Sequence, residues 1–265
     1  MITVISGGEY AVDKILRMAE IFRRGKRTFI AAMDHGLFIG PVAGIKDVQK
    51  TVQEMLAGGA DAFFFTPGIA KIVANHIAGK AGLVMSIPDD ETSVIEAVKA
   101  GAVGVKTTYF GPVPLSQEKN RQLTRVAHAC DEWNMVYVIE VAPMDPETNR
   151  LIYDPDVVAM AARIGAEIGG DIVKTVYTGN CETFRQVVES CPVPIVILGG
   201  PKVESDLEVL KWVKGCVDAG GAGVAMGRNI WQHENPRAMA KAISKILHEN
   251  ASVEEAYKEL SKASH

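Results

Sequence analysis

The chain has 265 residues, and its 28 lysines and arginines against 32 aspartates and glutamates leave a formal net charge of −4. This length is enough to bury a large core, and α/β barrels of this size are commonly single domains. The sequence has no run of basic residues of the kind that binding to nucleic acid or to an anionic membrane requires. Its four cysteines form no Cys-x-x-Cys pair, and it shows neither a secretory leader nor an apolar stretch of about 18 residues. We therefore expect a reduced, cytoplasmic protein with neither a nucleic-acid nor a membrane partner.

Short apolar runs alternate with segments of helical period along the whole chain. A stretch at 10–24 comes first, and its apolar side chains at helical spacing predict a helix that closes the bottom of a barrel. Eight runs rich in β-branched residues then predict buried parallel strands at 28–33, 62–65, 83–86, 103–106, 136–141, 172–174, 195–198 and 223–226. The segments between them predict helices, and the last helix is expected from Pro236 onward.

Eight strand–helix units predict a (β/α)8 TIM barrel that takes up residues 1–265 as a single domain. Glycine-rich stretches at 58–61, 101–104, 169–171 and 220–223 support this pattern, because each closes a helix and opens a strand. The competing fold is an open doubly wound sheet, which usually carries a glycine-rich dinucleotide turn after its first strand. Here that turn reads Asp34-His35-Gly36, which favours the barrel.

Four charged side chains are expected at the mouth of this barrel, where the C-terminal ends of the strands form active sites. They are Asp34, Lys106, Glu140 and Lys174. Buried charges are costly unless paired, so the group is either a set of ion pairs or a reactive centre. Lys174 as a nucleophile needs a neutral amine, which desolvation and a neighbouring cation such as Lys106 favour. Asp34 is either a general base or the cap of the following helix.

Glycine turns follow the last two predicted strands. Gly199-Gly200 and Gly227-Arg228 place bare backbone amides where barrels commonly bind phosphate, although tight strand-to-helix turns would need the same glycines. His35 is a further candidate for the substrate site, with a purely structural hydrogen bond as its alternative. The six histidines show no pair at metal-binding spacing, so we expect no metal.

Several motifs together resemble a known family. In chain order they are Asp34-His35-Gly36, Gly40-Pro41, Lys174-Thr175-x-Tyr177-Thr178-Gly179, Gly199-Gly200-Pro201-Lys202 and Gly227-Arg228-Asn229-Ile230-Trp231-Gln232. They resemble the archaeal-type class I fructose-bisphosphate aldolase family, which includes 2-amino-3,7-dideoxy-heptulosonate synthases and autoinducer-2 thiolases. The resemblance implies a (β/α)8 barrel, a Schiff-base lysine at Lys174, an acidic residue at Asp34 and a phosphate site at the two glycine turns. It also implies a homo-oligomer built from rings of five subunits, singly or in pairs.

The sequence departs from this pattern at the fifth strand. The aldolases and heptulosonate synthases of the family carry Tyr-Pro-Arg-Gly there, with the tyrosine as proton donor, whereas this chain reads Ile139-Glu140-Val141-Ala142-Pro143-Met144. Proton transfer then falls to Glu140, or to another group such as Tyr109 or Tyr177. The thiolase branch lacks the same tyrosine.

The leading hypothesis is a class I aldolase that cleaves or forms a C–C bond in a phosphorylated ketose-type substrate. Lys174 would form the imine, and Asp34, assisted by Glu140 or Lys106, would move the protons. The alternatives are transfer of an acetyl group from a phosphorylated diketone to coenzyme A, a heptulosonate-type synthase reaction, and a phosphosugar-binding barrel without catalysis. The lysine imine requires no cofactor, and coenzyme A enters only as the co-substrate of the thiolase alternative.

Overall fold

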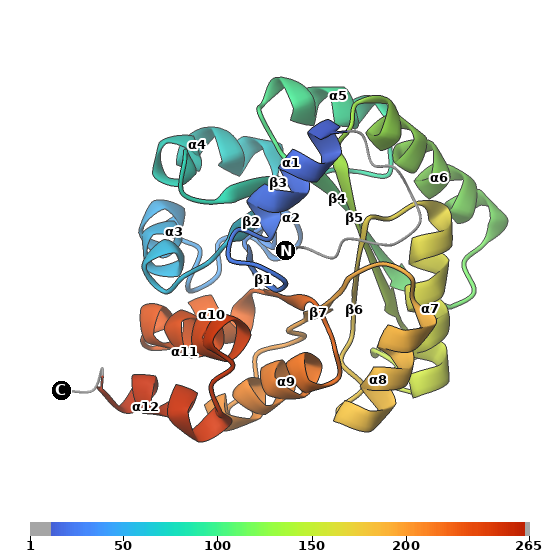
Figure 1. Cartoon of the computed structure of the whole chain (residues 1–265). Coiled ribbons are helices and arrows are strands. Elements are labelled where there is room, and N and C mark those ends of the chain that lie inside the picture. Colours follow the sequence, from blue (N-terminus) through green and yellow to red (C-terminus); the bar gives the residue numbers. More distant parts are fainter. Residues whose placement is uncertain (1–11, 263–265) are drawn as a thin grey trace.

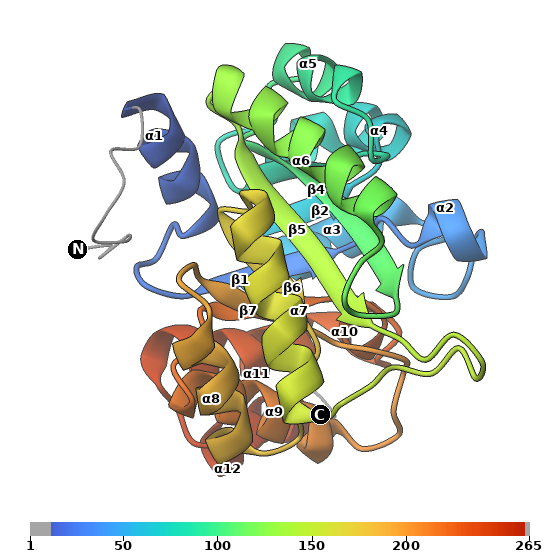
Figure 2. The same cartoon turned by 90° about the vertical axis from the view of Figure 1, so that its right-hand side faces the viewer.

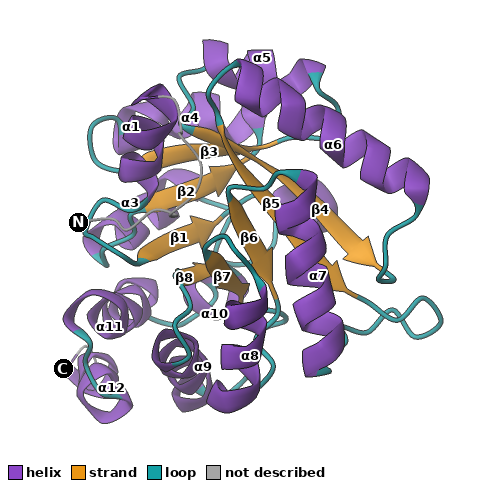
Figure 3. Ribbon diagram, turned by 45° about the vertical axis from the view of Figure 1, so that its right-hand side comes forward, coloured by secondary structure: helices purple, strands orange, loops and turns teal. Residues whose placement is uncertain are grey.

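The computed structural model describes residues 12–262, and part of the predicted helix at 10–24 therefore lies outside the described residues. Eight parallel strands close into a barrel in chain order (Figures 1 and 3). They are β1 (Thr28–Ala32), β2 (Ala62–Phe65), β3 (Gly82–Ser86), β4 (Gly104–Gly111), β5 (Val136–Pro143), β6 (Ile172–Thr175), β7 (Ile195–Leu198) and β8 (Gly223–Met226). The predicted (β/α)8 barrel is confirmed.

Helices surround the barrel and connect successive strands. They are α2 (Gly36–Ile39), α3 (Val48–Ala57), α4 (Pro67–Ile77), α5 (Thr92–Lys99), α6 (Gln117–Glu132), α7 (Pro155–Ile168), α8 (Cys181–Ser190), α9 (Asp206–Asp218), α10 (Arg228–Trp231), α11 (Pro236–Glu249) and α12 (Val253–Lys262). Side chains cap many of their N-termini, as Asp154 does for α7 and Asn180 for α8. Such caps satisfy amide groups that a helix start leaves unpaired, so each helix begins at a defined residue.

The remaining helix, α1 (Val12–Ile21), closes the N-terminal end of the barrel, as predicted. Figure 1 shows α1 lying across the strands, and Figure 2 places it at the end of the barrel opposite α2 and the loop after β5. Met18, Ile21 and Phe22 pack in one buried cluster with inward-facing residues such as Ile30 and Val138. The barrel floor is therefore filled mainly by apolar side chains, and the Thr28 hydroxyl there donates to the Ile21 carbonyl oxygen.

A second and larger apolar layer lies between the strands and the surrounding helices. Because successive side chains of a strand point to opposite faces, each strand contributes alternate residues to the two layers. In β4, Lys106 faces the barrel interior, whereas Thr107 bonds with the buried Tyr137 hydroxyl and belongs to the outer side. Strands β4 and β5 run to Gly111 and Pro143, further than predicted, and carry additional side chains to the mouth.

Candidate active site

Strand register explains why three charged side chains meet inside the barrel, and Asp34 joins them from just beyond the end of β1. Glu140 of β5 is the direct partner of Lys174 on β6 and of Thr108 on β4. Lys106 on β4 is in turn the partner of Ser86 on β3. Directly paired residues of neighbouring strands point to the same face, so these side chains converge in one layer near the C-terminal ends of the strands.

Glu140 bridges the two lysines. Its Oε1 lies 2.7 Å from Lys174 Nζ, and its Oε2 lies 2.9 Å from Lys106 Nζ. The Thr108 hydroxyl donates a further bond of 3.2 Å to Oε2. All three charged groups are at most 4% exposed. The amine of Lys174 is therefore held away from bulk water beside a carboxylate that is positioned to exchange a proton with it.

Asp34 completes the cluster on the opposite side of Lys106. Its Oδ2 accepts bonds of 2.6 Å from Lys106 Nζ and from the Ser86 hydroxyl. Below this layer, the Phe64 ring lies 5.2 Å from both lysine nitrogens, where its face stabilises cations. Of the alternatives considered for Asp34 and Lys106, ion pairing is present: Lys106 contacts both carboxylates, and Asp34 does not cap the following helix.

The cluster shifts the pKa values of the two lysines in opposite directions. Burial alone lowers the pKa of Lys106, but Asp34 and Glu140 outweigh it and raise that pKa above the ordinary value. For Lys174, burial is the largest effect, the charge of Lys106 adds to it, and the pKa is lowered despite Glu140. Burial raises the pKa of Asp34 and of Glu140, yet the two lysines outweigh it and hold both below their ordinary values. Lys106 is the permanent cation, and Lys174 is the amine that more readily becomes neutral.

His35 and Arg228 lie beside this cluster. Burial lowers the pKa of His35 to about 4, and the charges of Lys174 and Arg228 act in the same direction against Asp34. His35 is therefore neutral near pH 7, with Nδ1 3.6 Å from Asp34 Oδ1, beyond hydrogen-bond distance. Arg228 is half-buried, and its Nε has no hydrogen-bond partner among residues 12–262. Each of the two side chains thus has a buried polar atom without a protein partner in this part of the chain.

The glycine turns stand where the sequence predicted them, directly after β7 and β8. Gly200 has a φ of 61°, which favours glycine. A Cβ on Gly227 would lie 2.6 Å from the Ala32 carbonyl oxygen and 2.7 Å from His35 Cε1. Gly227 thus lets the chain pass close to β1 and His35, which a larger residue would prevent.

The two tyrosines considered as proton donors lie outside the barrel interior. Tyr177 packs edge-on against Phe184 in the layer between strands and helices, with ring centroids 5.1 Å apart. Tyr109 packs on the same outer layer, and its hydroxyl donates to the Pro112 carbonyl oxygen. Neither tyrosine faces the charged cluster, whereas Glu140 is the acidic side chain that contacts Lys174 there.

Sequence reasoning missed two contacts at the mouth. Trp231, only 1% exposed, donates from Nε1 to the Ala32 carbonyl oxygen and packs edge-on against His35. The hydroxyl of Tyr153, from the loop after β5, lies 4.0 Å from the place a Cβ on Gly200 would occupy. Spacing along the chain could not reveal Tyr153, because an irregular loop brings it over β7.

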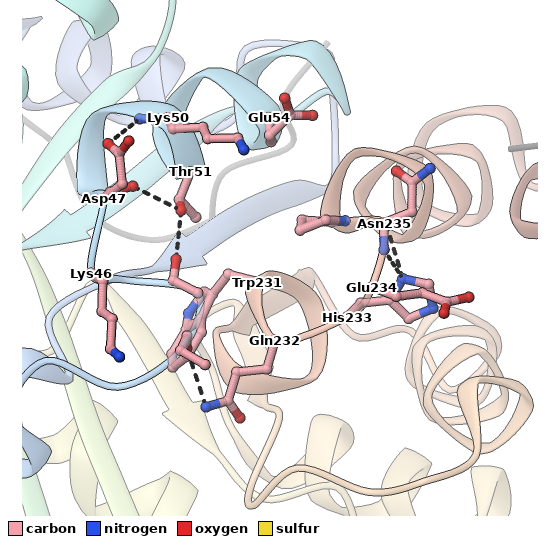
Figure 4. Close-up of a pocket in the computed structure, with 13 residues that line it drawn as sticks. Lys46, Asp47, Lys50, Thr51, Glu54, Trp231, Gln232, His233, Glu234 and Asn235 are labelled. Carbon is pink, nitrogen blue, oxygen red and sulfur yellow. Dashed lines mark hydrogen bonds between the residues drawn. The ribbon is translucent and has the colours of Figure 1, made fainter.

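A cavity of about 590 Å³ lies beside the barrel mouth rather than in it. It is lined by the start of α3 and by residues 231–236, and Lys46 and Lys50 lie on one side of it (Figure 4). None of the four clustered charged groups lines this cavity. Over residues 12–262, no three histidine, cysteine or acidic side chains gather as a metal ion would require, and no helix there is long and apolar enough to cross a membrane.

Comparison with known proteins places the chain among aldolases. Residues 28–233 match the family model described as DeoC/LacD family aldolase. An uncharacterized aldolase of Saccharolobus solfataricus is 32% identical, with 92% of this chain and 97% of that protein covered. A 2-amino-3,7-dideoxy-D-threo-hept-6-ulosonate synthase of Halobacterium salinarum is also 32% identical, with 87% and 90% covered.

Solved structures agree with these relatives. A Schiff-base-forming fructose-1,6-bisphosphate aldolase is 28% identical and superposes with a TM-score of 0.77, over 88% of this chain and 99% of that one. An archaeal fructose 1,6-bisphosphate aldolase is 27% identical with the same TM-score, over 89% of this chain and 99% of that one. The resemblance noted from the motifs is thereby confirmed. The chain is an aldolase-type enzyme, and it belongs to the DeoC/LacD aldolase family.

Proposed function

We propose that this enzyme is a class I aldolase in which Lys174 forms a Schiff base with a phosphorylated ketose-type substrate. The observation that carries this proposal is the buried contact of 2.7 Å between Lys174 Nζ and Glu140 Oε1, inside a barrel of an aldolase family. A lysine attacks a carbonyl only as the free amine. The lowered pKa of Lys174 raises the fraction of that form at neutral pH.

Glu140 and Asp34 move the protons. Glu140 accepts the ammonium proton of Lys174, and the amine attacks the ketone carbon. Glu140 then returns that proton to the hydroxyl of the carbinolamine, which leaves as water to give a protonated imine. Asp34 then takes the proton of the substrate hydroxyl, the neighbouring C–C bond breaks, and its electron pair moves into the imine to give an enamine. Return of a proton to the enamine carbon and hydrolysis of the imine release the product. The reverse sequence forms the bond.

Charge balance in the cluster supports this cycle. With both lysines protonated, Lys106 and Lys174 balance Asp34 and Glu140, so the buried group is neutral. Transfer of the Lys174 proton to Glu140 keeps this balance, because Lys106 then balances Asp34. A protonated imine at the same nitrogen, with Glu140 ionised again, leaves the group neutral as well, and buried charges are most stable when they are balanced. The site therefore stabilises the intermediate that the reaction must pass through.

The phosphate would bind at the turns after β7 and β8, beside the half-buried Arg228. The Arg228 side chain is only half-buried, although its Nε is buried and lacks a protein partner within the described part of the chain, and an arginine fork matches phosphate geometry. Neutral His35 adds a hydrogen-bonding group without repelling an anion. The name of the Halobacterium relative makes a heptulosonate-type synthase reaction the second candidate.

The test is borohydride reduction of the protein mixed with dihydroxyacetone phosphate, followed by mass spectrometry of the intact protein and its peptides. We expect one stable adduct, on the peptide that contains Lys174, and none in the Lys174→Met variant. An adduct on Lys106 instead would exchange the roles of the two lysines. A protein that forms no adduct with this or any other phosphorylated ketone would refute the Schiff-base proposal.

A further inference from the structure

Asn229 is a fully buried polar side chain that the proposed chemistry does not use. It stands on α10, directly after Arg228, and its side chain makes three hydrogen bonds to the loop that follows β7. Nδ2 donates to the carbonyl oxygens of Gly199 at 2.6 Å and of Pro201 at 3.0 Å. Oδ1 accepts from the Val203 N–H at 2.9 Å. Both amide protons and the amide oxygen are therefore engaged with one loop.

These bonds determine which way the loop's own N–H groups point. In a planar trans peptide the C=O and the following N–H point in opposite directions. Because the carbonyls of Gly199 and Pro201 point at Asn229, the N–H groups of Gly200 and Lys202 point away from it. Neither N–H donates to a protein acceptor within residues 12–262. Two unpaired amide donors on one turn are what an anion site needs.

We propose that Asn229 is a positioning residue for the phosphate of the substrate. It holds the loop after β7 so that the Gly200 and Lys202 amides and the Arg228 side chain face one anion. A second contact holds the far end of the same loop, because His233 Nε2 lies 3.0 Å from Asp206 Oδ2 at the start of α9. The inference rests on the proposed function, because that function places the phosphate of the substrate at the glycine turn.

The chemistry of the asparagine amide explains why related side chains would fail. Asn229→Asp puts an oxygen in place of Nδ2, facing two carbonyl oxygens and burying a charge. Asn229→Ala leaves the two carbonyls and the Val203 N–H without partners, so the loop must turn some of them toward water. Either change releases the amides that point at the phosphate, while Lys174 and Glu140 on other strands keep their contacts.

The experiment compares two ketones that differ only in phosphate. Borohydride trapping on Lys174 is titrated with dihydroxyacetone phosphate and with dihydroxyacetone, for the native protein and for Asn229→Ala. We expect the half-saturating concentration of the phosphorylated ketone to rise by roughly tenfold or more, and that of dihydroxyacetone to stay within about twofold. The matched control is Asn235→Ala, which removes the asparagine cap of α11 but keeps the backbone contacts of residue 235 with His233, and its side chain makes no bond to the loop after β7. It should change neither titration.

Equal weakening of both ketones, or no change in either, would overturn the positioning role. If Asn229→Ala does not fold, Gly200→Ala strains the same loop at a φ of 61° without emptying a buried site, and it must show the same selective loss. If the native protein traps neither ketone, the proposed function fails. Calorimetric binding of inorganic phosphate to the native and Asn229→Ala proteins then decides the role of Asn229 by itself.

Discussion

Replacing Lys106 by methionine tests whether the charge of Lys106 lowers the pKa of Lys174. The variant removes the permanent cation but keeps a side chain of similar length in the buried layer. Lys174 then has Asp34 and Glu140 near it without an opposing positive charge. Since Lys106 lowers the pKa of Lys174 and the carboxylates raise it, we expect the pKa of Lys174 to rise in Lys106→Met.

The size of this shift can be worked from the contacts with Glu140. Lys106 and Lys174 approach opposite oxygens of its carboxylate, at 2.9 Å and 2.7 Å. Their nitrogens are thus roughly 6 Å apart, and at an effective dielectric constant of about 20 the repulsion is about 2.8 kcal/mol. That energy corresponds to about 2 pKa units. At pH values below both pKa values the neutral fraction of Lys174, and with it the trapping rate, should fall about 100-fold.

The assay is the rate of borohydride trapping with dihydroxyacetone phosphate across a pH series, at saturating ketone. Trapping should rise with pH in both proteins, with the rise about 2 units later in the variant, so that alkaline pH restores much of its rate. Lys99→Met removes a lysine from an exposed pair with Glu96 and is the matched control. A variant profile that overlays the native one would refute the tuning role of Lys106, and so would a loss that alkaline pH does not restore.

Three further outcomes follow from the site. Tyr153→Phe removes the hydroxyl near Gly200, so the KM for a phosphorylated ketone should rise about threefold with kcat unchanged in steady-state assays. The two buried lysines lower the pKa of Asp34, so its stabilisation is complete above about pH 4 and is lost as pH falls through its folded-state pKa. In thermal denaturation, Asp34→Asn should therefore show a smaller fall in Tm on acidification than the native protein. Finally, the acidic residues 89–91 follow β3, across the barrel from β7. Lys119 pairs with Asp89 and Arg125 with Glu91, which leaves Asp90 as the carboxylate of this segment that would repel a second phosphate. The ratio of kcat/KM should then favour fructose 1-phosphate over fructose 1,6-bisphosphate, and the reverse preference would contradict this account.

Local patterns were sufficient to predict the barrel and the members of the charged cluster. The strands are short apolar runs between glycine turns, and each of the four charged residues stands at or just after the C-terminal end of such a run. Because all parallel strands end at one face, this position alone predicts that the side chains meet. Which of these side chains contact one another could not be predicted from position alone. That Glu140 lies between the lysines follows from the register of β5 with β4 and β6.

Contacts made by irregular or extended segments could not be predicted. Strand β4 continues through Thr108 to Gly111, and the sequence offers no apolar signal for this polar extension. Because β4 continues, the side chain of Tyr109 points outward. Without that continuation the sequence shows only a tyrosine near the mouth, which makes it a candidate proton donor. Asn229 was visible as part of a motif, but its role depends on backbone carbonyls 28 and 30 residues away in the chain. Only the folded structure brings these groups together.

If the substrate is phosphorylated, as proposed, the distribution of charge in the site also explains how an acidic protein would bind an anion. The interior cluster is neutral when both lysines are protonated, so it exerts little long-range attraction, and the chain as a whole carries a net charge of −4. Binding of phosphate must therefore depend on short-range groups: the amides after β7 and the single guanidinium of Arg228. Such contacts depend on geometry more than on charge, and salt screens them less than it screens long-range attraction between exposed charges. In the proposal made above, one buried asparagine that orients those amides would therefore decide whether the enzyme distinguishes a phosphorylated ketone from its unphosphorylated counterpart.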